Sequence, residues 1–124
     1  MRDQVVDSSP DDRQRVALWV ALAAGPAAAA LHLPVSYALV KFACAWQRRT
    51  PLLMVALAAL LLAAAGVWLA FASEARLRAA ADEQGGRPID RSLFLARVAL
   101  GTNLTLALFI AGTAVATMVL SPCE

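Results

Sequence analysis

The sequence predicts an all-α fold, a three-helix transmembrane bundle with a cytoplasmic N-terminus and a periplasmic C-terminus. Of the 124 residues, 60% are hydrophobic and only 16% are charged, whereas soluble domains carry roughly 25% charged residues. The charges gather in the N-terminal tail, between Lys41 and Arg49, and between Glu74 and Arg91, and three long apolar runs separate these groups. Each run reaches the about 20 residues that cross a bilayer core of roughly 30 Å. The runs are rich in Leu and Ala and lack period-2 alternation, so helices are expected rather than barrel strands.

The expected elements follow in chain order. Residues 1–15, "MRDQVVDSSPDDRQR", are predicted to be a disordered cytoplasmic tail that is too long and too acidic for a signal-peptide leader. Residues 16–120 form the transmembrane domain, with helices over 16–43, 52–82 and 92–120, and residues 121–124 form a periplasmic C-terminus. The polar segment "EARLRAAADEQ" favours extension of the second helix beyond the membrane, up to a stop at "GG". Arg97 lies about one turn inside the third run and is expected to snorkel to the inner surface.

The orientation rests on the distribution of basic residues, which accumulate on the cytoplasmic side of a membrane. Eight of the eleven Lys and Arg residues fall on the side of the N-terminus and of the second loop: Arg2, Arg13, Arg15, Arg76, Arg78, Arg87, Arg91 and Arg97. The other side has Lys41, Arg48 and Arg49. This asymmetry predicts that the N-terminus lies on the cytoplasmic side and the C-terminus on the opposite side of the membrane.

Two prolines interrupt the first apolar run. Pro26 and Pro34 are predicted to kink the helix, because each lacks the backbone donor that would bond the carbonyl four residues earlier. In lipid, the two carbonyls that lose their partners need hydrogen bonds from neighbouring helices, hydroxyls or water. They belong to Leu22 and Ala30.

Polar side chains in the first and third runs are expected to meet. The two helices run in the same direction, and matching their ends gives an offset of 76 to 79 residues, which places Asn103 beside the first kink and Thr113 beside the second. The hydroxyl of Ser36 can bond back to the carbonyl of His32. We therefore predict an intramembrane polar cluster that joins the two helices, made of His32, Ser36, Tyr37, Asn103 and Thr113.

His32 is the single histidine of the chain, and an ionisable residue at this depth is a candidate functional group. Haem ligation would need a second axial ligand, and Met118 is displaced from His32 by roughly 10–15 Å along the helix. A proton relay would need further titratable groups at depth, where Tyr37 is the nearest. The third alternative, which we favour over these two, is a neutral histidine that hydrogen-bonds another helix.

The two cysteines lie at the same end of the predicted bundle. Cys44 ends the first helix, and Cys123 follows Pro122 after the third, 79 residues later. With the N-terminus inside, both face the oxidising periplasm, where disulfides persist. We predict a Cys44–Cys123 disulfide that holds helices 1 and 3 together. The alternatives are two unrelated buried thiols or a metal site, for which two thiols without a histidine make a poor ligand set.

Features of catalysis are missing from the sequence. It has no paired carboxylates, no Ser-His-Asp set, no phosphate-binding loop and no cluster of metal ligands, so we expect no enzyme, catalytic residue, metal or cofactor. The net charge of +2 is too small to suggest binding of nucleic acid. The expected partners are the lipid bilayer and other membrane protein subunits.

Three segments of the chain carry a resemblance to known proteins: "AAGPAAAALHLPVSYALVKFAC", "RSLFLARVAL" and the terminal "SPC". They resemble a group of small three-helix bacterial inner-membrane proteins encoded with cytochrome c oxidase (haem-copper terminal oxidase) components, which implies a multi-pass protein of a bacterial inner membrane. The shared residues are Gly25, Pro26, His32, Ser36, Tyr37, Leu39, Val40, Cys44, Pro122 and Cys123. The chain differs from that group in having alanines where a tryptophan precedes the histidine. The resemblance implies a small subunit or an assembly partner of a respiratory complex and implies no catalysis.

The function that we expect is that of a non-catalytic accessory subunit or assembly partner of a larger membrane complex, with a terminal oxidase as the complex that the resemblance suggests. The alternative is a small homo-oligomeric channel or transport component. Purification from the native membrane in mild detergent distinguishes the two, because oxidase subunits accompany the protein in the first case alone.

Overall fold

The computed structural model describes residues 3–84, 87–120 and 123, and the side chains of 12–83, 89–120 and 123 among them. These residues form three α-helices without strands: α1 (Asp3–Ala45), α2 (Thr50–Gln84) and α3 (Arg87–Val119). Each helix includes a segment long and apolar enough to cross a membrane, namely Asp12–Ala45, Thr50–Glu83 and Ile89–Val119. The prediction of an all-α chain with three such helices is confirmed.

The polar N-terminal segment departs from its prediction, because α1 is helical from Asp3 onward and the expected disordered tail is wrong for the described residues 3–15. Helix nucleation is unfavourable, whereas extension of an existing helix adds one hydrogen bond for each residue fixed. The apolar part of α1 provides that existing helix. The other bounds differ from the predicted 16–43, 52–82 and 92–120 by one to five residues, and all but the end of α3 at Val119 lie outside the predicted ranges.

A tight turn joins α1 to α2. Gln47 N donates to Cys44 O over 3.2 Å and Arg48 N donates to Ala43 O over 3.1 Å, which is the hydrogen-bond pattern of a Schellman motif. This motif needs a left-handed residue after the helix, and Gln47 has a φ of 52°. Pro51 near the start of α2 has a suitable φ and needs no amide partner there.

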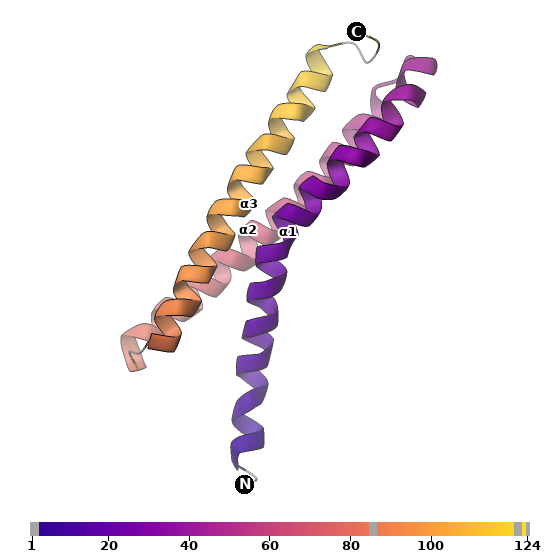
Figure 1. Ribbon diagram of the computed structural model, residues 1–124. Coiled ribbons are helices and arrows are strands. Elements are labelled where there is room, and N and C mark those ends of the chain that lie inside the picture. The colour runs from indigo at the N-terminus through magenta and orange to yellow at the C-terminus, as the bar shows by residue number, and fades with distance from the viewer. Residues whose placement is uncertain (1–2, 85–86, 121–122, 124) are drawn as a thin grey trace.

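The three helices pack on one another, with α2 antiparallel to α1 and α3. Figure 1 shows that α1 bends near its middle, so that its C-terminal part runs along α2 while its N-terminal part turns away from the other two helices. Pro26 is the proline nearest to the middle of α1. The end of the bundle that holds Ala45, Thr50 and Val119 is called the disulfide end below, and the opposite end, where α2 passes into α3, is called the Glu74 end.

Small side chains fill the centre of the bundle and large ones face outward. The cores are built mostly on alanines, with exposed fractions of 0–1% at Ala21, Ala28, Ala63, Ala70, Ala96 and Ala99. Bulky apolar residues such as Trp19, Leu31, Phe42, Leu61 and Phe94 are more than half exposed. Lipid tails are as apolar as these side chains, so helices in a membrane associate through close packing of small residues.

Candidate functional site

The two cysteines form the predicted disulfide. The Cα atoms of Cys44 and Cys123 lie 5.3 Å apart, within the range that a disulfide bridges. Around the bond, Gln47 Nε2 donates to Cys123 Sγ over 3.5 Å and Arg49 donates to the carbonyl of Met118 over 2.6 Å. The second contact satisfies a carbonyl at the C-terminus of α3, where positive charge is favourable. The turn after α1 therefore holds the end of α3.

His32 joins α1 to α3 at the middle of the bundle. The residue is 5% exposed, and its Nε2 lies 3.1 Å from Thr113 Oγ1. Thr113 Oγ1 donates its own proton to the carbonyl of Ile110 over 2.7 Å, so it accepts from His32 Nε2–H. Ser36 Oγ then donates to His32 Nδ1 over 3.3 Å. All the hydrogen bonds in this network fit a neutral imidazole that carries its proton on Nε2.

The structure brings together three of the five residues of the predicted polar cluster, His32, Ser36 and Thr113. Ser36 donates to the ring of His32 and not to its carbonyl as predicted. Tyr37 lies outside the cluster, with 79% of its surface exposed, because five residues along a helix of 3.6 residues per turn lead to a different face.

Asn103 forms a separate buried layer, since ten residues, or about 15 Å of helix, separate it from Thr113. Its side chain is fully buried, and its Nδ2 donates to the carbonyls of Ala21 and Ala99 over 2.6 and 2.7 Å. The sequence led us to expect an acceptor at Leu22. Successive carbonyls point about 100° apart around a helix, and the carbonyl of Ala21 is the one that faces α3.

Two glycines make room for Asn103. A Cβ atom at Gly25 would lie 2.7 Å from Asn103 Oδ1, and a Cβ atom at Gly66 would lie closer still. Asn103 Oδ1 has no hydrogen-bond partner among the described residues, so it faces the Cα hydrogens of the two glycines, which form only weak hydrogen bonds. Exchange of the amide oxygen and nitrogen would instead place the oxygen against two carbonyls. Asn103 thus locks α1, α2 and α3 together.

Arg97 has a partner that we did not predict. Glu74 Oε1 accepts from Arg97 Nε over 3.2 Å and from Arg78 over 2.6 Å, and the carboxylate side chain is 10% exposed. Arg97 was expected to reach the membrane surface alone. The sequence does contain a signal for this pair, because Glu74 lies eleven residues before Gly85 and Arg97 lies eleven residues after Gly86. Positions equally far from a hairpin turn face each other in antiparallel helices.

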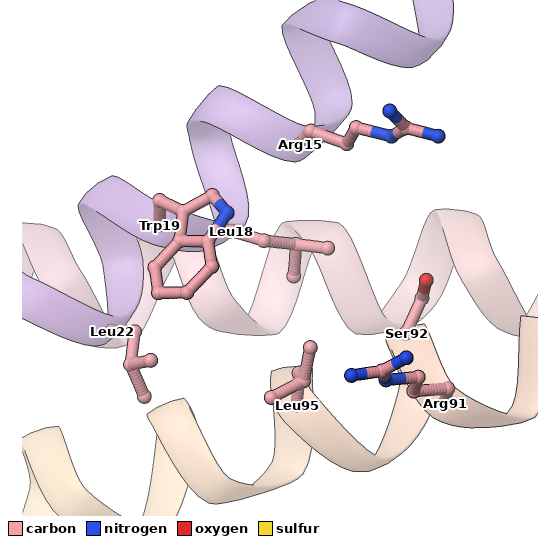
Figure 2. Close-up of a pocket in the computed structure, with 7 residues that line it drawn as sticks. All are labelled: Arg15, Leu18, Trp19, Leu22, Arg91, Ser92 and Leu95. Atoms are coloured by element: carbon pink, nitrogen blue, oxygen red, sulfur yellow. The ribbon is translucent and has the colours of Figure 1, made fainter.

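A groove opens between the N-terminal parts of α1 and α3. Its volume is about 580 Å³, within the size range of pockets that bind small molecules. Figure 2 shows Arg15 on α1 and Arg91 on α3 at the same end of the groove, with Leu18 and Leu95 farther in and Trp19 and Leu22 beyond. We call it the α1–α3 groove, lined by Arg15, Leu18, Trp19, Leu22, Arg91, Ser92 and Leu95.

The polar side chains described above are used mainly to hold the three helices together. Within residues 3–84, 87–120 and 123, no three His, Cys, Asp or Glu residues are grouped so that they could hold a metal ion. Both ring nitrogens of His32, both hydrogens of the Asn103 amide and one oxygen of Glu74 bond groups of the same chain. Comparison with protein-family models, with curated proteins and with solved structures finds no match to the chain.

Proposed function

We propose that the protein is a non-catalytic integral membrane subunit or assembly partner of a larger complex in a bacterial inner membrane. The observation that carries this proposal is that the polar side chains deep in the bundle form hydrogen bonds within the chain. His32 bonds Thr113 and Ser36, and Asn103 bonds the backbone of α1 and α3. His32 also lines a cavity of about 200 Å³ whose other lining residues are apolar, but both of its ring nitrogens are hydrogen-bonded within the chain. A transport path or an active site would instead present polar groups to the cavity. Other subunits would therefore contact the outer surface of the bundle.

The same proposal places the N-terminus in the cytoplasm and the disulfide in the periplasm. The Cys44–Cys123 bond supports this orientation, because disulfides persist in an oxidising compartment. The excess of arginines at the Glu74 end supports it as well.

The outer face of α3 is suited to contact with another helix. A Cβ atom at Gly101 or Gly112 would meet nothing within 4 Å, so both glycines present bare backbone outward. Small residues let helix backbones approach closely in membranes. The resemblance to proteins encoded with terminal oxidases makes an oxidase the first complex to test.

The test is purification of the tagged protein from its native membrane in mild detergent, followed by haem absorbance and identification of the subunits. We expect terminal-oxidase subunits in stoichiometric amounts. A single species that forms a defined homo-oligomer without other subunits would contradict the proposal and favour a channel or transport component.

A matched pair of variants tests whether α3 makes the contact. Gly112→Leu adds a side chain where the structure has open space, so the bundle should fold while the partner is lost. Ala65→Leu makes a similar change on an exposed position of α2 and should retain the partner. If Gly112→Leu retains the partner in full, the outer face of α3 is not the contact surface.

A further inference from the structure

We propose that the α1–α3 groove binds an anionic phospholipid, with its phosphate between Arg15 and Arg91 and an acyl chain along the leucines. This proposal is independent of the partner proposed above. It rests on the arrangement of charge and apolar surface along the groove, on the pairing of the nearby arginines, and on the divergence of α1 from the other helices.

The groove is charged at one end and apolar along the rest of its length, as a phospholipid is. Arg15 and Arg91 lie at one end on opposite walls, and apolar side chains continue from them (Figure 2). From Arg15 to Leu22 the helix rises about 10 Å, enough for the upper part of an acyl chain. Guanidinium groups bind phosphate oxygens through paired, charge-assisted hydrogen bonds, and basic pockets between transmembrane helices bind anionic headgroups.

Two pairs of arginines at this end of the bundle have different surroundings. Arg78 and Arg97 bond the carboxylate of Glu74. Among the described side chains, Arg15 and Arg91 bond no carboxylate, and both are exposed. The groove therefore presents two positive charges that no described carboxylate pairs with, beside an apolar surface that lipid must cover.

The groove lies where α1 leaves the bundle. Leu18 and Ala21 still pack against α2 and α3, and the N-terminal part of α1 turns away from both helices (Figure 1). The groove therefore opens between diverging helices. Trp19 lines the groove and is 68% exposed. Its fluorescence can therefore report on a lipid that enters the groove.

The experiment uses the full chain with Trp46→Phe and Trp68→Phe, which leaves Trp19 as the single fluorophore. The protein is reconstituted in phosphatidylcholine with a small fraction of phosphatidylglycerol brominated on its acyl chains, or with the same fraction of brominated phosphatidylcholine. We expect stronger quenching by the anionic lipid, with an apparent preference of about fivefold for each arginine. Equal quenching by the two lipids would overturn the proposal.

Two double variants locate the effect. Arg15→Gln/Arg91→Gln should abolish the preference for the anionic lipid, and Arg13→Gln/Arg76→Gln, which removes two exposed arginines near the same end of the bundle, should keep it. Circular dichroism and non-reducing electrophoresis establish that each variant has folded and formed its disulfide. If both pairs reduce the preference equally, the attraction belongs to the charged surface in general and the groove is not the site.

Discussion

Glycine at position 66 shows how closely single residues are matched in the centre of the bundle. The side chain of Asn103 occupies the space that a Cβ atom at Gly66 would take, and such an atom would also lie 2.8 Å from the Cβ of Ala24. Both neighbours belong to other helices. The residue thus decides how near α2 can approach α1 and α3.

Gly66→Ala should therefore destabilise the bundle by about 1–3 kcal/mol, the usual effect of overpacking. The measurement is the free energy of unfolding in mixed detergent micelles. Gly112→Ala is the control, because its Cβ atom meets nothing within 4 Å, and it should be neutral. Combining Gly66→Ala with Asn103→Ala should recover part of the loss through a favourable coupling energy. Equal effects at Gly66 and Gly112 would contradict the packing that we describe.

The ring of His32 should carry a proton on Nε2, because Thr113 Oγ1 already donates to Ile110 and can only accept from the ring. Nitrogen NMR of the protein labelled at its single histidine distinguishes the two tautomers. Thr113→Val removes the acceptor while it keeps the shape, and it should cost about 0.6 kcal/mol, the average for such contacts in membranes. A ring with its proton on Nδ1 would contradict the assignment of Thr113 as the acceptor and Ser36 as the donor.

At the scale of the elements, Gln47 holds a conformation that suits glycine better. It ends α1 with a φ of 52°, and side chains raise the energy of left-handed backbone by roughly 1–2 kcal/mol. Gln47→Gly should stabilise the protein by about 1 kcal/mol in thermal or denaturant unfolding. Gln47→Ala serves as the control, since it loses the bond to Cys123 but keeps the strain, and it should give no gain. A gain in both variants would mean that relief of backbone strain is not the cause.

The helices and the disulfide could be predicted from the sequence because they depend on patterns along one chain, namely apolar length and matched ends. The offset of 76 to 79 residues between α1 and α3 also placed Asn103 at the level of Gly25 correctly, since that pair is 78 residues apart and in contact. It failed at the next level, where His32 meets Thr113 at a separation of 81. Depth matching assumes straight parallel helices, and a bend in α1 changes the offset along its length.

Which face a residue occupies was harder to predict than its depth. Tyr37 was assigned to the polar cluster by depth and lies on the outside, while Glu74 was assigned to the polar extension of the second helix beyond the membrane and lies against Arg97. The nearly uniform apolar character of membrane helices removes the amphipathic pattern that identifies the inner face in a soluble protein. The face on which each of these residues lies is known only from the tertiary contacts.

At the scale of the whole molecule, the two ends of the bundle are held by different means. At the Glu74 end, Glu74 links α2 to α3 through Arg97. At the disulfide end, none of residues 111–119 of α3 is buried, and Figure 1 shows this part of α3 apart from α1 and α2. It is attached through the disulfide, the Arg49–Met118 bond and the His32–Thr113 bond.

The double variant Cys44→Ser/Cys123→Ser should consequently release the end of α3 and leave the rest in place. A cross-link over 79 residues contributes at most about 4.5 kcal/mol through the entropy of the unfolded chain, and less here because helices persist in the unfolded state of membrane proteins. Local opening needs few contacts to break, so amide hydrogen exchange in detergent should rise over residues 114–120 and stay unchanged over 96–110. Glu74→Gln is the reciprocal variant, and it should raise exchange only near the Glu74 end. If loss of the disulfide raises exchange evenly through all three helices, then α3 does not open locally and the bundle responds as one unit.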